Sequence, residues 1–94
     1  MATKTKKKKL VRGDIAVVEW IDACSQDEWG KSDEIDLAPE YVVSCGIVFE
    51  HDSEKITLAL NHDPSNDSFS CLMTIPVGMI VKVKEIKYEK TKAI

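Results

Sequence analysis

Residues Val42–Ile86 read VVSCGIVFEHDSEKITLALNHDPSNDSFSCLMTIPVGMIVKVKEI. Three or four strand-like runs follow one another in this segment, and only short polar turns separate them. The residues alternate with the period of a β-strand: one side of the first run carries Val43, Cys45, Ile47 and Phe49, and one side of the next carries Ile56, Leu58 and Leu60. Because the turns leave no room for a helix, the segment predicts an antiparallel β-meander.

Turn residues on either side of this segment and within it set the limits of five predicted strands. The strands span residues 15–23, 41–50, 55–61, 68–75 and 79–86. The tight corner Pro76-Val77-Gly78 is expected to form a single 3₁₀ turn before the last strand. Both faces of the first strand are partly apolar, with Ile15, Val17 and Ile21 on one face and Ala16, Val18 and Trp20 on the other. We therefore expect this strand to be covered on both faces or nearly so.

Residues 24–40, CSQDEWGKSDEIDLAPE, form the least regular and most acidic part of the chain. Their composition predicts a long loop with a short helical turn between the first two strands. Trp29 in this loop is interpreted either as a lid over the end of the barrel or as an exposed contact residue, and we favour the lid.

Five strands, one long early loop and a Pro-x-Gly corner predict an all-β fold, a five-stranded antiparallel SH3-like barrel. An OB-fold barrel is the alternative interpretation. It is disfavoured because that fold is usually larger and carries a helix between its third and fourth strands.

The length and charge distribution predict one folded domain between two unstructured ends. The 94 residues suffice for one small core, and no run approaches the ~18 apolar residues of a membrane span or forms a secretory signal. Residues 1–12 carry six basic side chains and no acid, whereas the remainder has seven basic and sixteen acidic residues, a charge of −9. We expect a disordered basic arm over 1–12, a barrel over 13–88 and a frayed tail over 89–94, in a cytoplasmic protein without a membrane partner.

The titratable and metal-binding residue types point away from catalysis. Three cysteines, Cys24, Cys45 and Cys71, cannot all pair, and we expect buried structural thiols in a reducing compartment. No close Cys or His pair predicts a metal site, and no cofactor is expected. The pairs His51-Asp52 and His62-Asp63 are interpreted as exposed turn residues because sequence neighbours usually point apart, so no enzymatic activity is predicted.

Two motifs resemble those of a known family. The spacing Gly46-x-Val48-x-x-x-Asp52 resembles the first Sm motif, in which a glycine bends the second strand and an acid follows in the turn. The segment Ile75-x-x-Gly78-x-x-Val81 is similar to the second Sm motif, in which a glycine corner leads into the last strand. The chain thus resembles the Sm-like (LSm/Hfq) superfamily, and its small size and the tetrapeptide Trp20–Ala23 resemble small phage-borne proteins.

This resemblance implies positions for a nucleic-acid site. Sm proteins bind a base between a residue just before the third strand, an asparagine after it and an arginine ahead of the second-motif glycine. Here these positions fall near Lys55, Thr57 and Val77, followed by Gly78, and none carries the usual residue. His51 and Lys55 are the basic side chains in reach. A separate candidate is the basic arm, where charge alone suits Lys6, Lys7, Lys8 and Lys9 to a nucleic-acid backbone. The alternative, which the sequence favours, is a solvated lysine-rich tail that aids solubility.

The fourth predicted strand indicates self-association. Residues 68–75 contain no lysine or proline to guard an exposed edge, and both faces carry apolar side chains. Pairing of this strand with the last strand of a neighbouring copy satisfies the free amides, and a repeated head-to-tail contact closes into a ring. The resemblance implies five to seven subunits. The predicted interface comprises Phe69, Cys71, Leu72, Met73, Ile75, Val81 and Val83.

Two functions remain open from the sequence. The first is a ring-forming Sm-like protein that binds single-stranded RNA, or nucleic-acid backbone, as a chaperone or regulator in a bacterial or phage-infected cell. The second is a non-catalytic oligomeric scaffold without RNA affinity, whose partner surface is the acidic loop Asp27–Glu40.

Overall fold

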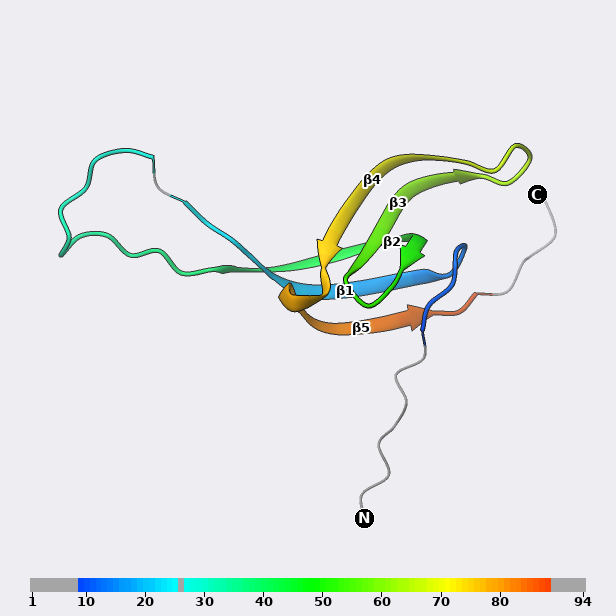
Figure 1. Ribbon diagram of the computed structural model, residues 1–94, viewed down its shortest axis with the longest axis horizontal. Coiled ribbons are helices and arrows are strands. Elements are labelled where there is room, and N and C mark those ends of the chain that lie inside the picture. The colour runs from blue at the N-terminus through cyan, green and yellow to red at the C-terminus, as the bar shows by residue number, and fades with distance from the viewer. Residues whose placement is uncertain (1–8, 26, 89–94) are drawn as a thin grey trace, which may run out of the picture.

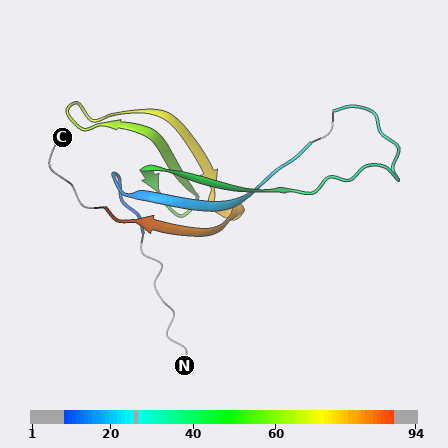
Figure 2. The same cartoon turned by 180° about the vertical axis from the view of Figure 1, so that it is seen from behind.

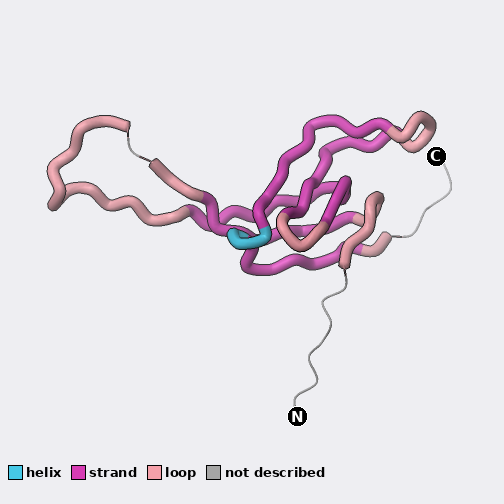
Figure 3. The backbone as a smooth tube through the Cα atoms, viewed as in Figure 1, coloured by secondary structure: helices cyan, strands magenta, loops and turns pink. Residues whose placement is uncertain are grey.

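The computed structural model describes residues 9–25 and 27–88 and contains five strands and one short 3₁₀ helix (Figures 1 and 3). The elements are β1 (Ile15–Asp22), β2 (Glu40–His51), β3 (Lys55–Asp63), β4 (Ser68–Pro76), η1 (Val77–Met79) and β5 (Ile80–Ile86). The all-β fold and the 3₁₀ corner are confirmed, and each strand lies within two residues of its predicted bounds. The predicted tail and residues 1–8 of the predicted arm lie outside the described residues.

All strand pairs are antiparallel, and the strand order is β4-β3-β2-β1-β5. The sheet is open, because β4 and β5 form its two edges and their described residues do not pair with each other. Strands β3 and β4 curve away from the plane of β1 and β5 (Figures 1 and 2). Residues 64–67 form a turn between β3 and β4, where the OB-fold alternative places a helix.

One face of β1 lies against the hydrophobic core, and the other is only partly covered. Ala16, Val18 and Trp20 are buried, whereas Ile15 and Val17 are half-buried, so the second face has less cover than the expectation of two covered or nearly covered faces. The Trp20 indole Nε1 donates a hydrogen bond to Ser44 Oγ at 3.0 Å, so its polar group is satisfied next to the core.

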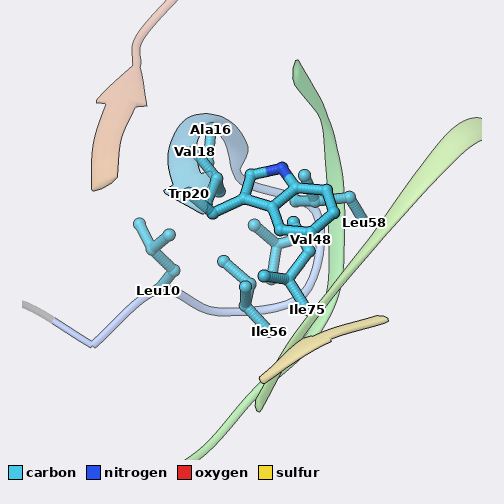
Figure 4. Packing of buried hydrophobic residues seen from close by; sticks show 8 residues of the cluster. All are labelled: Leu10, Ala16, Val18, Trp20, Val48, Ile56, Leu58 and Ile75. Atoms are coloured by element: carbon cyan, nitrogen blue, oxygen red, sulfur yellow. The ribbon is translucent and has the colours of Figure 1, made fainter. Parts of the chain in front are cut away.

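The core gathers side chains from four strands and from the N-terminal segment (Figure 4). Its buried members are Leu10, Ala16, Val18, Trp20, Val48, Ile56, Leu58 and Ile75. Leu10 was assigned to the basic arm by sequence, yet it is buried, and its N–H donates to His51 Nδ1 at 3.2 Å. Next to it, the Gly13 N–H donates to the Val48 carbonyl at 2.8 Å. The folded part therefore begins by residue 10.

Two irregularities decide which side chains enter this core. The register of β2 against β3 shifts between Val48 and Glu50, so Phe49 is an extra residue in β2. The register of β1 against β5 shifts between Glu19 and Trp20, where Lys82 and Ile80 are the successive partners, so Val81 is extra in β5. As a result, Ile80 and Val83 pack against the core while Val81 is exposed.

The prediction of buried cysteines is wrong, because all three thiols are exposed. Cys45 pairs with Val17 on the partly covered face of the β1–β2 ribbon, opposite the core. Cys71 lies on the edge strand β4 with φ of 56°, in the left-handed region. Cys24 lies in the loop after β1, where its Sγ contacts the Ala38 carbonyl oxygen at 3.2 Å.

The acidic loop, residues 23–39, extends away from the sheet at the end of the β1–β2 ribbon (Figures 1 and 2). One helical turn is present, because the N–H groups of Glu34 and Ile35 both donate to the Lys31 carbonyl, at 2.8 and 3.2 Å. Trp29 is fully exposed, so the lid interpretation is wrong and the tryptophan is available for contact with a partner. No helix among the described residues is long and apolar enough to cross a membrane.

Candidate functional site

The β2–β3 turn, where the predicted nucleic-acid site is centred, is organised by Asp52. One carboxylate oxygen, Oδ1, accepts the backbone N–H groups of Glu54 and Lys55 at 2.8 and 2.9 Å. The Asp52 N–H donates to the Lys55 carbonyl at 3.0 Å and closes the hairpin. The Glu54 N–H, with the Lys55 ammonium and the Lys55 N–H, lowers the pKa of Asp52 to about 2 because each favours the ionised carboxylate.

The charge of Lys55 is offset by two carboxylates. Its Nζ lies 2.7 Å from Glu50 Oε1 and 3.0 Å from Asp52 Oδ2. The hydrogen bond to Glu50, followed by that to Asp52, raises the pKa of Lys55 well above its usual range. With Glu54 the turn holds three acids and one lysine, so its net charge of −2 repels a phosphate.

Two other predicted site residues are engaged inside the subunit. Thr57 is buried, and its hydroxyl lies 2.8 Å from that of Thr74 on β4. His51 is half-buried in β2 rather than an exposed turn residue, and its Nδ1 accepts the Leu10 N–H. In this arrangement Nδ1 is the unprotonated nitrogen, so a neutral ring carries its proton on Nε2.

The structure does bring the two Sm-like motifs to one end of the sheet. Lys55 pairs with Pro76, and the Val77 N–H donates to the Glu54 carbonyl at 2.8 Å. Val77 and Gly78 are exposed in η1, beside the β2–β3 turn. Lys9 is exposed, whereas Lys6, Lys7 and Lys8 lie outside the described residues. The predicted positions on the two motifs are therefore neighbours, but these described residues do not form a basic pocket.

The predicted interface residues divide by burial. Leu72, Met73, Val81 and Cys71 are exposed, and Phe69 and Val83 are half-buried. Ile75 is a correction to the predicted set, because its side chain is fully buried in the core of its own subunit and is not accessible to another copy. The exposed members lie on β4 and β5, the two edges of the sheet.

A row of rings at the opposite end of β3 was missed by sequence reasoning. His62 and Phe69 are cross-strand partners, and their rings stack with centroids 4.0 Å apart and an interplanar angle of 6°. Phe69 meets Phe49 edge-to-face at 5.0 Å, and the Arg12 guanidinium lies 4.4 Å from the Phe49 ring centroid. The only local signal is that His62 and Phe69 flank the predicted turn almost symmetrically.

His62 is held in place on its strand rather than exposed in a turn, which corrects the sequence interpretation. Its Nε2 lies 3.2 Å from Asp67 Oδ1, and 22% of its side chain is exposed. Asp63 next to it accepts the Ser65 hydroxyl and N–H at 2.7 and 3.0 Å, contacts that lower the pKa of Asp63. The β3–β4 turn is thus a hydrogen-bonded unit that orients the imidazole.

Two cavities lie at the end of the sheet where β1 begins, and His62 of this row lines the larger of them. The larger has a volume of about 320 Å³ and is lined by Gly13, Ile15, Ile47, His62, Pro64 and Tyr88. The smaller, of about 210 Å³, is lined by Gly13, Asp14, Ile15, Glu85, Ile86, Lys87 and Tyr88. Tyr88 borders both cavities.

Within the described part of the chain, no three His, Cys, Asp or Glu side chains converge in a way that holds a metal ion. Comparison with protein families, with characterised proteins and with solved structures finds no match to this chain.

Proposed function

We propose that this chain is a Sm-like, SH3-barrel subunit that assembles into a homo-oligomeric ring and binds single-stranded RNA or nucleic-acid backbone without catalysis. The observation that carries this proposal is the open sheet with two edges at opposite ends of the strand order, β4 and β5. Each edge presents backbone N–H and C=O groups that no other strand in the described part of the chain pairs.

Pairing of β4 with β5 of the next copy would give hydrogen-bond partners to the backbone groups of both edges. It also covers Leu72 and Met73 on β4 and Val81 on β5, which are all exposed in the single subunit. Because the two edges differ, the contact is head-to-tail, and it closes into a ring when the rotation between copies permits. The Sm-like resemblance suggests five to seven copies.

The basic N-terminal arm is the part of the proposal that contacts nucleic acid. Residues 1–9 contain five lysines and no acid, whereas the β2–β3 turn is acidic and its lysine is ion-paired. Backbone binding requires only positive charge, and a ring presents several arms to one strand, which raises the effective concentration of each. The Sm-type base site is therefore secondary to the arm in this proposal.

A scaffold ring without RNA affinity is the second candidate, and the acidic loop favours it. Residues 23–39 carry five acids and one lysine, and Trp29, Ile35 and Leu37 are exposed among them. An exposed aromatic side chain within an acidic surface suits a basic protein partner.

Two measurements on the full chain test the proposal. Light scattering or sedimentation at micromolar concentration is expected to give the mass of a closed oligomer, and a monomer would contradict the ring. A gel shift with oligo-U and oligo-A at two salt concentrations is expected to show binding that weakens steeply with salt, because bound lysines release counterions. A ring that binds neither oligonucleotide at low salt leaves the scaffold function.

A further inference from the structure

The larger cavity near Tyr88 has the chemistry of a site for a planar ring. Its volume of about 320 Å³ lies at the lower end of the range for small-ligand pockets, about 300–1,000 Å³. Two aliphatic side chains, Ile15 and Ile47, are cross-strand partners that line it, and His62 and Tyr88 contribute aromatic rings. None of the described residues that line it is an acid, a lysine or an arginine.

The two rings that line this cavity differ: the His62 ring is held in place by its neighbours, and the Tyr88 ring is exposed. His62 is stacked on Phe69 and contacts Asp67, so its position is fixed by two neighbours. Tyr88 follows β5 and is 62% exposed, so its ring is accessible to a ligand. A fixed ring and an accessible ring at one cavity provide stacking surfaces for a flat, neutral group.

The charges around the two cavities indicate whether the base or the phosphate of a nucleotide fits each of them. The smaller cavity is bordered by Asp14 and Glu85 as well as Lys87, a mixture that disfavours a phosphate. The larger cavity has no fixed charge among its lining residues, which suits the base and not the phosphate.

From this geometry we infer that the larger cavity binds one base of a single-stranded nucleic acid, with the base against Tyr88 and His62 over Ile15 and Ile47. The inference rests on the proposed nucleic-acid function and adds a base contact to the backbone contact of the arm. Stacking accepts any base because every base has a π-face, so the site favours unpaired nucleotides over a particular sequence.

The test compares two tyrosine variants of the full chain in oligonucleotide binding. Tyr88→Ala removes the accessible ring of the cavity. Tyr41→Ala is the matched control, because Tyr41 is 57% exposed and lies at the other end of the β1–β2 ribbon, where its hydroxyl contacts Glu19. Tyr88→Ala is expected to weaken oligo-U and oligo-A binding at least about 5-fold relative to Tyr41→Ala, and Tyr88→Phe is expected to restore it. Equal affinities of the two alanine variants would overturn the inference and leave backbone binding intact.

A second measurement separates the cavity from the rest of the nucleic-acid function. Labelled full-length protein is titrated with AMP, UMP and ribose 5-phosphate while the ring resonances of Tyr88 and His62 are followed by NMR. The two nucleotides are expected to shift both residues, whereas ribose 5-phosphate is not. Equal shifts with ribose 5-phosphate would overturn base recognition. Nucleotide shifts in a protein that fails to bind either oligonucleotide would support the cavity and contradict the proposed function.

Discussion

At the scale of single residues, Gly46 shows how closely β2 and β3 approach each other. A Cβ atom at this position would lie 2.9 Å from the Ala59 carbonyl oxygen and 3.0 Å from Leu58 Cβ. The carbonyl belongs to the backbone of a paired strand, so it cannot move aside without disturbing the β2–β3 pairing. Glycine is therefore required here by space, and this position is the glycine of the first Sm-like motif.

The Gly46→Ala variant is expected to lose about 1–3 kcal/mol of unfolding free energy, the usual cost of overpacking. Urea denaturation followed by circular dichroism measures the loss. Gly78→Ala is the matched control, because a Cβ there would meet nothing within 4 Å. If both variants have the stability of the wild type, the close approach of the two strands does not exist in solution.

Asp52 makes the stability of the β2–β3 turn sensitive to acid. The pKa of its carboxyl is about 2 in the folded chain, below its ordinary 3.8, chiefly because of the hydrogen bond from the Glu54 N–H. Its contribution is therefore complete above pH 3.8 and is lost as pH falls from about 4 to 2.

The Asp52→Asn variant is expected to be less stable than the wild type at neutral pH and to approach it as pH falls toward 2. Urea midpoints of both proteins at several pH values between 7 and 2 measure the difference. Asp27→Asn in the acidic loop controls for the loss of one negative charge. A gap that stays constant over this range would show that the ionised carboxylate does not hold the turn.

At the scale of elements, the proposed assembly depends on the two edge strands, β4 and β5. Leu72 on β4 and Leu37 in the acidic loop are each 49% exposed, so they form a matched pair for the same substitution. Leu72 belongs to β4, the edge strand of the proposed contact, and Leu37 belongs to the acidic loop, which projects away from the sheet (Figure 1).

Leu72→Glu is expected to lower the mass in solution toward that of a monomer, because a buried unpaired charge opposes edge pairing. Leu37→Glu is expected to leave the mass unchanged. Sedimentation velocity distinguishes the two variants. An oligomer that survives Leu72→Glu would exclude β4 as the contact.

The acidic loop is expected to be dispensable for folding. The β1–β2 pairing continues to Asp22 and Glu40, and the described residues of the loop are exposed. Replacement of residues 23–39 by an Asn-Gly turn should retain the fold and add about 1–2 kcal/mol of unfolding free energy, because a shorter connection costs less closure entropy. Denaturation followed by the fluorescence of Trp20 measures this. Loss of the cooperative transition would show that the loop contributes to the core.

The strands were predictable from the sequence because their signals are local. Alternation and turn residues placed each strand within two residues, and Pro76 and Gly78 marked the 3₁₀ corner. The sequence did not predict which face of β2 packs against the core, because apolar residues occur on both sides of that strand. The small Gly46 lies on the side that faces the core, so Val48 is buried and Cys45 is exposed.

The candidate site was predictable only in part, for related reasons. The two Sm-like motifs do meet, because hairpin pairing brings Lys55 to Pro76. The ion pairs of Lys55 depend on where the bulge at Phe49 leaves Glu50, and no sequence pattern marks that bulge. The row of three rings and the Arg12 guanidinium comes from segments far apart in the sequence, namely Arg12, Phe49, His62 and Phe69. Their contacts could therefore not be predicted before the fold was known.

At the scale of the whole molecule, charge is separated along the sequence. The net charge of −3 combines a basic arm with an acidic remainder, and the acidic loop lies at the far end of the ribbon from residues 9–12 (Figure 1). In the proposed head-to-tail ring, every copy would carry one basic arm and one acidic loop.

Deletion of residues 1–9 is expected to weaken oligonucleotide binding and to flatten its dependence on salt, because five lysines are removed. Lys55→Ala is expected to have little effect, since that lysine is already paired with Glu50 and Asp52. Gel shifts at two salt concentrations compare the two variants. The reverse result would move the nucleic-acid contact from the arm to the β2–β3 turn.

The burial of Leu10 makes the end point of such a truncation critical. A chain that starts at residue 10 loses the lysines and keeps the buried Leu10 side chain in the core, although the nitrogen that contacts His51 becomes the N-terminal amine. A chain that starts at residue 13 also loses the buried Leu10 side chain and the contact between the Arg12 guanidinium and the Phe49 ring. Three residues thus separate a truncation that removes charge from one that also removes core packing, and weak RNA binding by the shorter chain cannot be assigned to missing charge alone.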